Sequence, residues 1–274
     1  MNRLTAGLLL WACLVPGCSD PPAPAGDIGA PDRAPLGADA RDRDSGREAG
    51  TDVMPDVAAP DVTPAPCPAG MVHVATFCID PYEAPNNPGA QPLVMYTFVE
   101  AAAWCQARGK RLCFDDEWTL ACAGPGGLSY PYGNAHQPGV CNDDKTWKVY
   151  SQSKLNGWPP SASGPTVGSL QDLLAAARAV SPTAKAAADH VEALYQAEPP
   201  GAGQGCRNSQ HPVFDLCGNV EEWTRRRDGG EPQFHGSLKG RYWAEPRTCQ
   251  SAVTTHGDGF RFYEIGFRCC RDPL

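Results

Sequence analysis

Hydrophobic residues divide the chain into three stretches of different pattern. Residues 6–15 form one continuous apolar run behind a short basic start, and residues 19–66 contain no Phe, Trp, Tyr or Lys. Residues 67–274 hold every Tyr and Phe and six of the seven Trp. These roughly 208 residues are enough for one sizeable core. The pattern therefore predicts one folded domain behind a segment that has no core of its own.

Short periodic segments predict the first elements of this domain. Apolar and polar residues alternate over 71–79, which predicts a hairpin around a turn. Apolar positions at helical spacing predict a helix over 98–108. A second helix is expected to follow soon after, with Asp115 or Asp116 as its N-terminal cap.

The middle of the domain has a different character. Residues 170–197 are rich in Ala and have high helix propensity, and Pro- and Gly-rich stretches flank them. A helical insertion over about 160–205 is therefore expected. Residues 214–223 and 260–270 predict short strand and turn pieces. The 29 Gly and 28 Pro indicate a loop-rich fold or a disordered segment.

The N-terminal apolar run is typical of a secretory signal. It ends in Val15-Pro16-Gly17-Cys18, which resembles the bacterial lipobox, where cleavage precedes a cysteine that then carries a lipid. Residues 1–17 are thus predicted to be a lipoprotein signal peptide, with an ordinary secretory signal as the alternative. The expected location is extracytoplasmic and anchored to a bacterial membrane through the lipid on Cys18. Ser19, rather than Asp, follows this cysteine, which by resemblance to enterobacterial sorting favours the outer membrane.

Residues 18–66 are predicted to be a disordered tether rich in Pro and Asp. From residue 19 onward they contain nine Pro, ten acidic residues and four Arg, so their net charge is 4 − 10 = −6. Such a segment buries too little apolar surface to offset the entropy of ordering. Most of the protein's net charge of −8 belongs to this tether, and the acidic balance argues against nucleic-acid binding.

Five segments of the folded domain occur in a recognisable order. In chain order they are CIDPYE (78–83), AWCQARGKRL (103–112) with Glu117-Trp118 after it, YPYGN (130–134), FDLCGNVEEWT (214–224) and GFRC (266–269). Together they resemble the formylglycine-generating enzyme, or sulfatase-modifying factor, family. The resemblance covers most of 69–272. It implies an α+β fold that is irregular and loop-rich, related to C-type lectin folds and crosslinked by disulfides.

The resemblance also implies two long-range disulfides. The family's bridged positions match Cys105 with Cys269, and Cys122 with Cys249. Each bridge alone would close a loop of more than a hundred residues, worth about 4–5 kcal/mol by chain entropy.

Other bridges are expected from position in the chain. Cys67 and Cys78 bracket the predicted hairpin, and Cys141 and Cys206 flank the predicted insertion. Three cysteines remain, and one of them must stay unpaired or bond outside the chain if Cys18 is lipidated. These are Cys113, Cys217 and Cys270, of which Cys113 with Cys270 is one candidate pair.

Formylglycine generation, as the resemblance implies it, oxidises a substrate thiol at Cu(I) held by two cysteines in a C-x4-C arrangement. These cysteines follow a Gly-Gly-Ser strand, which 235–237 resembles here. The only C-x4-C of this chain, Cys13 with Cys18, lies in the signal segment. The matching segment instead offers Arg241, Tyr242, Trp243 and Glu245. No copper and no catalytic residue of this kind is expected, and the six His are too dispersed to indicate the iron site of the related sulfoxide synthases.

A structural Ca²⁺ is the cofactor that the resemblance does imply. The family binds it through side chains and backbone carbonyls around the D-M-x-G-N-V-W-E motif and after the Y-P-W-G-N loop. Oxygen donors at short spacing suit this hard cation. The matching residues are Asp215, Gly218, Val220 and Glu222 for one site, and Asn142 and Asp143 for another. The alternative is a turn tied together by hydrogen bonds alone.

Three classes of function are compatible with these residues. The favoured one is a membrane-tethered, non-catalytic domain that binds a protein, peptide or glycan, as C-type-lectin-like folds do. The second is an oxidoreductase-like enzyme of the same family that uses a non-standard site. The third is formylglycine generation by an arrangement that the motifs do not reveal.

Overall fold

The computed structural model describes residues 67–274. The predicted signal peptide (1–17), the lipidation site at Cys18 and the predicted tether (18–66) lie outside the described residues. Among the described residues, no helix has the length and apolarity needed to cross a membrane.

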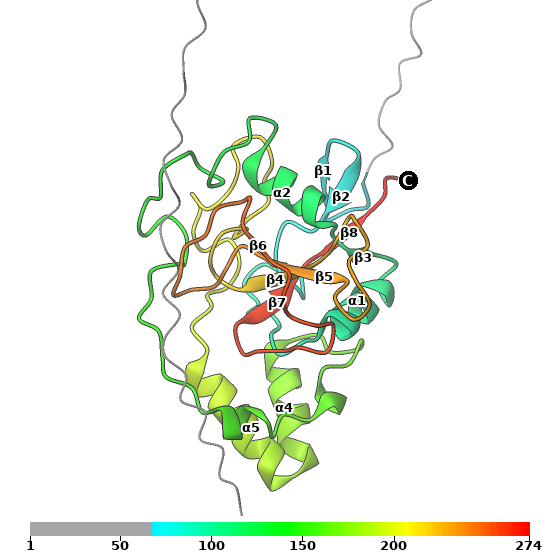
Figure 1. The fold of residues 1–274 in the computed structure, drawn as a ribbon, viewed down its shortest axis with the longest axis vertical. Coiled ribbons are helices and arrows are strands. Elements are labelled where there is room, and N and C mark those ends of the chain that lie inside the picture. The colour runs from blue at the N-terminus through cyan, green and yellow to red at the C-terminus, as the bar shows by residue number, and fades with distance from the viewer. Residues whose placement is uncertain (1–66) are drawn as a thin grey trace, which may run out of the picture. The chain divides into compact units, whose positions relative to one another are not determined.

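The domain contains two small sheets (Figure 1). The first has the order β1-β2-β8-β3 and is antiparallel throughout. The second has the order β6-β5-β4-β7, with β4 and β7 parallel. The strands of the first are β1 (Val72–Val74), β2 (Phe77–Ile79), β3 (Arg111–Leu112) and β8 (Cys269–Arg271). Those of the second are β4 (Glu221–Arg225), β5 (Gly236–Lys239), β6 (Ala252–Val253) and β7 (Ile265–Phe267). Strands this short, joined by long loops, confirm the predicted α+β, loop-rich fold.

The predicted hairpin is the β1–β2 pair, in which Val74 lies opposite Phe77. The first predicted helix is α1 (Phe98–Gln106), and Thr97 with Glu100 forms a reciprocal cap at its start. The second is α2 (Asp115–Ala123).

The prediction that Asp115 or Asp116 caps α2 is wrong. The cap position is Phe114, and its backbone N–H donates to Glu117 Oε2 at 2.9 Å. Asp115 and Asp116 lie in the first turn of the helix, where the helix dipole favours negative charge. Glu117 is held in this position by Arg111 of β3, a residue outside the local sequence pattern of the helix.

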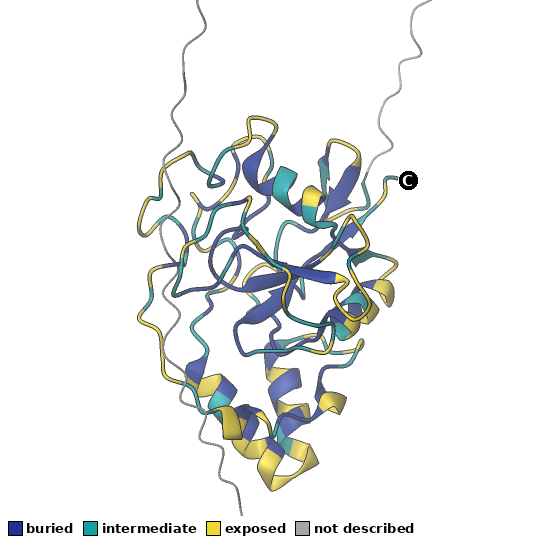
Figure 2. Cartoon of the chain, viewed as in Figure 1, coloured by how far each residue is buried: buried dark blue, intermediate teal, exposed yellow. Residues whose placement is uncertain are grey.

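The Ala-rich stretch forms two helices at one end of the view, below the second sheet (Figure 1). They are α4 (Leu170–Val180) and α5 (Pro182–Leu194), and two shorter elements, α3 (Gln152–Leu155) and η1 (Pro160–Ala162), precede them. Ser181 separates the two helices because Pro182 has no N–H to continue α4. The outer turns of both helices are exposed, whereas β5 and β7 of the second sheet are buried (Figure 2).

Buried apolar residues form two clusters. The larger one joins Trp104, Trp223 and Phe267 of the sheet region to Leu173 of α4 and Val191 of α5. The smaller one surrounds Trp118 and is rich in cysteine. The helical insertion therefore shares its core with the sheets.

Five disulfides crosslink the described residues, and they have the pairing that the sequence suggested. They are Cys67–Cys78, Cys105–Cys269, Cys113–Cys270, Cys122–Cys249 and Cys141–Cys206. Cys217 is the one free cysteine among residues 67–274, and it is wholly buried.

Candidate functional site

Arg268 lies at the centre of a buried polar cluster where three of the sequence motifs meet. Parallel pairing of β4 with β7 places Glu222 opposite Gly266, so the side chain of Arg268 reaches Glu222 across the sheet. Its guanidinium donates to Glu222 Oε1 at 2.6 Å and to Oε2 at 2.8 Å. It also donates to the carbonyl oxygens of Phe214 and Pro81. The arginine of the GFRC motif thereby connects the CIDPYE motif with the FDLCGNVEEWT motif.

Two further carboxyl groups, Glu83 and Asp215, are buried beside this ion pair. Burial, together with the charge of Asp215, raises the pKa of Glu83 well above its usual range. Burial raises the pKa of Asp215 to about 6. If Glu83, Asp215 and Glu222 were all ionised, these three carboxylates and Arg268 together would have a net charge of 1 − 3 = −2. The cluster therefore favours either protons or an additional cation.

Asn219 connects this cluster to the residues after the YPYGN loop. Its amide nitrogen donates to Glu83 Oε1 at 2.9 Å, and its amide oxygen accepts from Asn142 Nδ2 at 3.0 Å. The neighbouring Gly218 has φ +80°, and a Cβ there would lie 2.5 Å from the carbonyl oxygen of Asn142. Glycine is needed at this close approach. The structure thus brings both sets of expected calcium ligands side by side.

Several oxygens in this region accept no hydrogen bond from the described residues. They are Glu83 Oε2, Asn142 Oδ1 and Asp143 Oδ1. Asp143 is fully buried, and its other oxygen lies 3.0 Å from His136 Nε2. Burial raises the pKa of Asp143 as well. Buried carboxylate and amide oxygens without partners are the donors that a hard cation requires.

The expected ligand set fits a calcium ion only in part. Both oxygens of Glu222 are already held by Arg268, and Oε2 also accepts from Trp118 Nε1 at 2.9 Å. Asp215 Oδ2 accepts from the N–H of Gly201 at 2.6 Å. Val220 is a buried residue immediately before β4. Glu222 is therefore best described as the hydrogen-bonded partner of Arg268. Glu83 Oε2, which the sequence analysis did not assign, is open in that it accepts no hydrogen bond, and it lies 3.9 Å from Arg268 Nη2 as an ion pair.

A cavity of about 270 Å³ opens beside Asn142. Its walls include Lys145 and Glu198, which form an ion pair with Nζ and Oε1 at 2.5 Å. Glu198 also donates its N–H to Asn219 Oδ1 at 2.8 Å. The loop after α5 thereby closes one side of the cluster.

The segment that matches the family's copper site is built from other chemistry. Arg241 donates to Glu245 Oε2 at 2.5 and 2.8 Å, and Trp243 is completely buried against Tyr195, with ring centroids 5.6 Å apart. Gly240 has φ +82°, and a Cβ there would lie 2.5 Å from the carbonyl oxygen of Leu216. A thiol side chain at position 240 would therefore clash with the backbone.

The other cysteines of residues 67–274 do not replace the missing pair. Cys249 is bonded to Cys122, and Cys217 has its Sγ 3.6 Å from Cys122 Sγ. Burial strongly raises the pKa of the Cys217 thiol, so it stays protonated and is a poor copper ligand. The cysteines that the structure describes therefore do not fit a Cu(I) site.

Two residues of the cluster around Arg268, and one buried carboxyl group outside it, were missed as site residues by sequence analysis. Glu83 and Asn219 lie within motifs, so their positions carried a signal, but no local pattern shows that they meet. Glu264 lies in no motif. It is buried beside Glu221, burial raises its pKa to about 8, and its Oε2 accepts no hydrogen bond from residues 67–274.

Known proteins resemble this chain as follows. It is 28% identical over 155 residues to the inactive C-alpha-formylglycine-generating enzyme 2 of Bos taurus, a match that covers 56% of this chain and 39% of that protein. The chain thus spans about two-fifths of that relative's length. Among solved structures, CarF shares 15% identity over 73% of this chain and 88% of its own, with a TM-score of 0.44. PvdO from Pseudomonas aeruginosa shares 16% over 72% and 80%, with a TM-score of 0.41.

Family membership follows from a family model, the sulfatase-modifying factor enzyme 1-like domain, which matches residues 72–273. These residues include all five motifs and both sheets. The match confirms the resemblance on which the expected C-type-lectin-related fold was based. The chain belongs to the formylglycine-generating enzyme, or sulfatase-modifying factor, family.

Proposed function

We propose that this protein is an extracytoplasmic, lipid-anchored domain that binds a protein, peptide or glycan and does not generate formylglycine. The absence of formylglycine generation is proposed from the segment between Gly240 and Cys249. An ion pair and a buried indole occupy the positions that match the copper site, and Cys249 is used in a disulfide. The mammalian relative is itself named as inactive.

Activity is tested by incubating the purified, oxidised protein with Cu(I), oxygen and a cysteine-containing sulfatase peptide. The expected result is an unchanged peptide mass, because the folded domain, residues 67–274, has no pair of free thiolates to hold copper. An active family member under the same conditions is the control. Conversion of the thiol to an aldehyde that is lost in Cys217→Ala would contradict the proposal.

An enzyme with a non-standard site is the second candidate. The observation in its favour is Glu264, a buried carboxyl group with a pKa of about 8, within reach of acid–base chemistry at neutral pH. Substrate turnover that Glu264→Gln abolishes, with the melting temperature unchanged, would support this candidate over the first.

Anchoring is proposed from Val15-Pro16-Gly17-Cys18 and the tether behind it. Five disulfides in the folded domain support an oxidising compartment outside the cytosol. Mass spectrometry of the native N-terminus is expected to find a lipid on Cys18, and an unmodified N-terminus at another residue would exclude it.

A structural Ca²⁺ beside Glu83 and Asn142 is proposed as the cofactor. Since burial raises the pKa of Glu83 and of Asp215, both gain protons at low pH, and protons compete with the cation. Calcium should therefore raise the melting temperature at about pH 7.5 and have much less effect at about pH 5, below the Asp215 pKa of about 6. Glu83→Gln should abolish the shift, and the exposed Glu192→Gln should not. Equal calcium shifts in both variants would contradict the site.

A further inference from the structure

Helices α4 and α5 enclose, together with the loop at Gln91, a cavity of about 340 Å³ that lies outside all five family motifs. Pockets for small molecules start at about this size. The residues that line it are Gln91, Leu170, Gln171, Leu174, Arg178, Val191, Glu192 and Tyr195.

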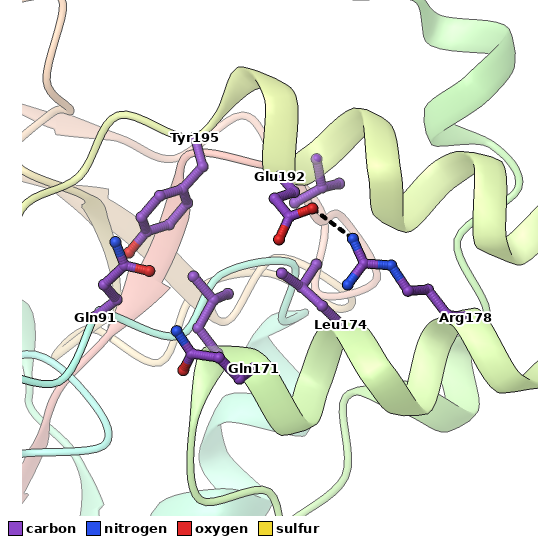
Figure 3. A pocket seen from close by; sticks show the side chains of 8 residues that line it. Gln91, Gln171, Leu174, Arg178, Glu192 and Tyr195 are labelled. Atoms are coloured by element: carbon purple, nitrogen blue, oxygen red, sulfur yellow. Dashed lines mark hydrogen bonds and ion pairs between the residues drawn. The ribbon is translucent and has the colours of Figure 1, made fainter.

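The cavity has an apolar floor and a polar rim. Leu170, Leu174 and Val191 are buried, whereas Gln171 and Glu192 are exposed. Figure 3 shows the glutamines towards one end and the ion pair at the other, with Leu174 between them. An occupant that lies on this floor would present its polar groups to both ends of the rim.

The two glutamine amides are free to bind a ligand. Neither Gln91 nor Gln171 makes a side-chain hydrogen bond to any residue of 67–274. An amide offers both an acceptor and donors, so each can pair with a hydroxyl group in either direction. Tyr195, in contrast, is fixed, because its hydroxyl donates to the carbonyl oxygen of Pro92 at 3.0 Å.

The charges at the cavity cancel. Arg178 bonds to Glu192 at 2.5 Å and to Asp189 at 2.8 Å, and Lys185 bonds to Asp189 at 2.6 Å. Two cations and two anions leave no net charge for an ionic ligand to neutralise. A charged ligand would lose hydration without gaining a counter-ion, so an uncharged ligand is favoured.

The walls also disfavour an extended peptide. Residues of α4 and α5 use their backbone groups within the helices, so no strand edge is available for β-strand addition. The recognition groups here are side chains, spaced around a compact, apolar floor.

We propose that this cavity binds a neutral sugar, with its C–H face on Leu174 and its hydroxyl groups hydrogen-bonded to Gln91, Gln171 and the Arg178–Glu192 pair. The inference rests on the proposed binding function and gives it a site and a ligand class. This site is distinct from the carboxylate cluster around Arg268.

The test uses saturation-transfer NMR on the purified full chain with glucose, galactose and N-acetylglucosamine, and with glucuronic acid and glucosamine as charged comparators. A neutral sugar is expected to bind and the charged ones to bind more weakly. Gln171→Ala should weaken binding about fivefold through the lost hydrogen bonds. Gln106→Ala, an exposed glutamine of α1 outside this cavity, should change it by less than about twofold.

Leu174→Trp, which fills the floor, should abolish the signal, and Gln171→Ala keeps the test decisive if the larger change prevents folding. Sugar binding that neither variant alters would overturn the cavity as the site while leaving the proposed binding function intact. Absence of binding by all three neutral sugars would overturn the ligand class. Binding of a peptide that is lost in Leu174→Trp would also overturn the ligand class, since the ligand in this cavity would then be a peptide.

Discussion

The two sheets and the pair of helices α4 and α5 achieve burial by different means. Strands of two to five residues make few ladder hydrogen bonds, and four of the five disulfides join the segments that carry or flank them. Short sheets are marginal without additional packing. Crosslinks that restrict the unfolded chain compensate for this weakness.

The helical insertion contains no cysteine between Cys141 and Cys206. Its stability comes from local hydrogen bonds, side-chain caps at Ser169 and Ser181, and buried residues such as Leu173 that face the sheet region. The comparison teaches that regular elements can rely on local structure and packing, whereas the irregular part needs covalent constraints.

Removal of the two disulfides that end at the neighbouring residues Cys269 and Cys270 should have the largest effect on the free energy of unfolding. Cys105–Cys269 and Cys113–Cys270 close nearly the same loop. When one of these disulfides is already formed, the second closes an additional loop of only about ten residues in the unfolded chain. Replacing either pair with alanine should lower the free energy of unfolding by about 3 kcal/mol, and replacing both by about 8 kcal/mol. This revises the 4–5 kcal/mol per bridge expected when each is considered by itself.

Denaturant unfolding of the three variants measures this coupling. Removal of Cys67–Cys78, which closes a separate short loop, is the control and should add to either single change without coupling. Losses near 5 kcal/mol for each single bridge, adding simply in the double variant, would contradict the shared-loop interpretation.

A cavity in α4 should have a smaller effect and leave the crosslinks intact. Leu173 is fully buried, so Leu173→Ala should lower the free energy of unfolding by about 3 kcal/mol. Val180→Ala, at an exposed position of the same helix, should change it by less than about 0.5 kcal/mol. Non-reducing peptide mapping should find all five disulfides in both. Equal destabilisation by the two changes would show that α4 does not share the core.

Loss of the cap between the two helices should have the smallest effect. Ser181 Oγ accepts from the N–H of Ala184 at 3.1 Å, and Ser181→Ala should cost about 1 kcal/mol by thermal unfolding. Ser181→Asn keeps an acceptor at this position and should be close to neutral. If both variants lose the same stability, the hydrogen bond is not the stabilising feature.

The hairpin at β1–β2, helix α1 and the helical character of 170–197 were predictable because their signals are local. Alternation, helical spacing and Ala content act over a few residues, and the structure has elements at these positions. The cap of α2 was not predictable in this way. The carboxylate of Glu117 accepts the N–H of Phe114 at this cap, and Arg111 of strand β3 holds that carboxylate in place.

The motifs likewise determined the family and the lack of a copper-binding cysteine pair, since both depend on which residues occur in which order. The site itself depended on tertiary structure. Glu83 meets Asn219 across 136 residues, and Arg268 takes Glu222 away from the ligand set expected for it. A sequence pattern records which charges exist, but burial and the competition among partners are properties of the folded chain. For that reason the open oxygen of Glu83, the raised pKa values and the cavity between α4 and α5 appeared only in three dimensions.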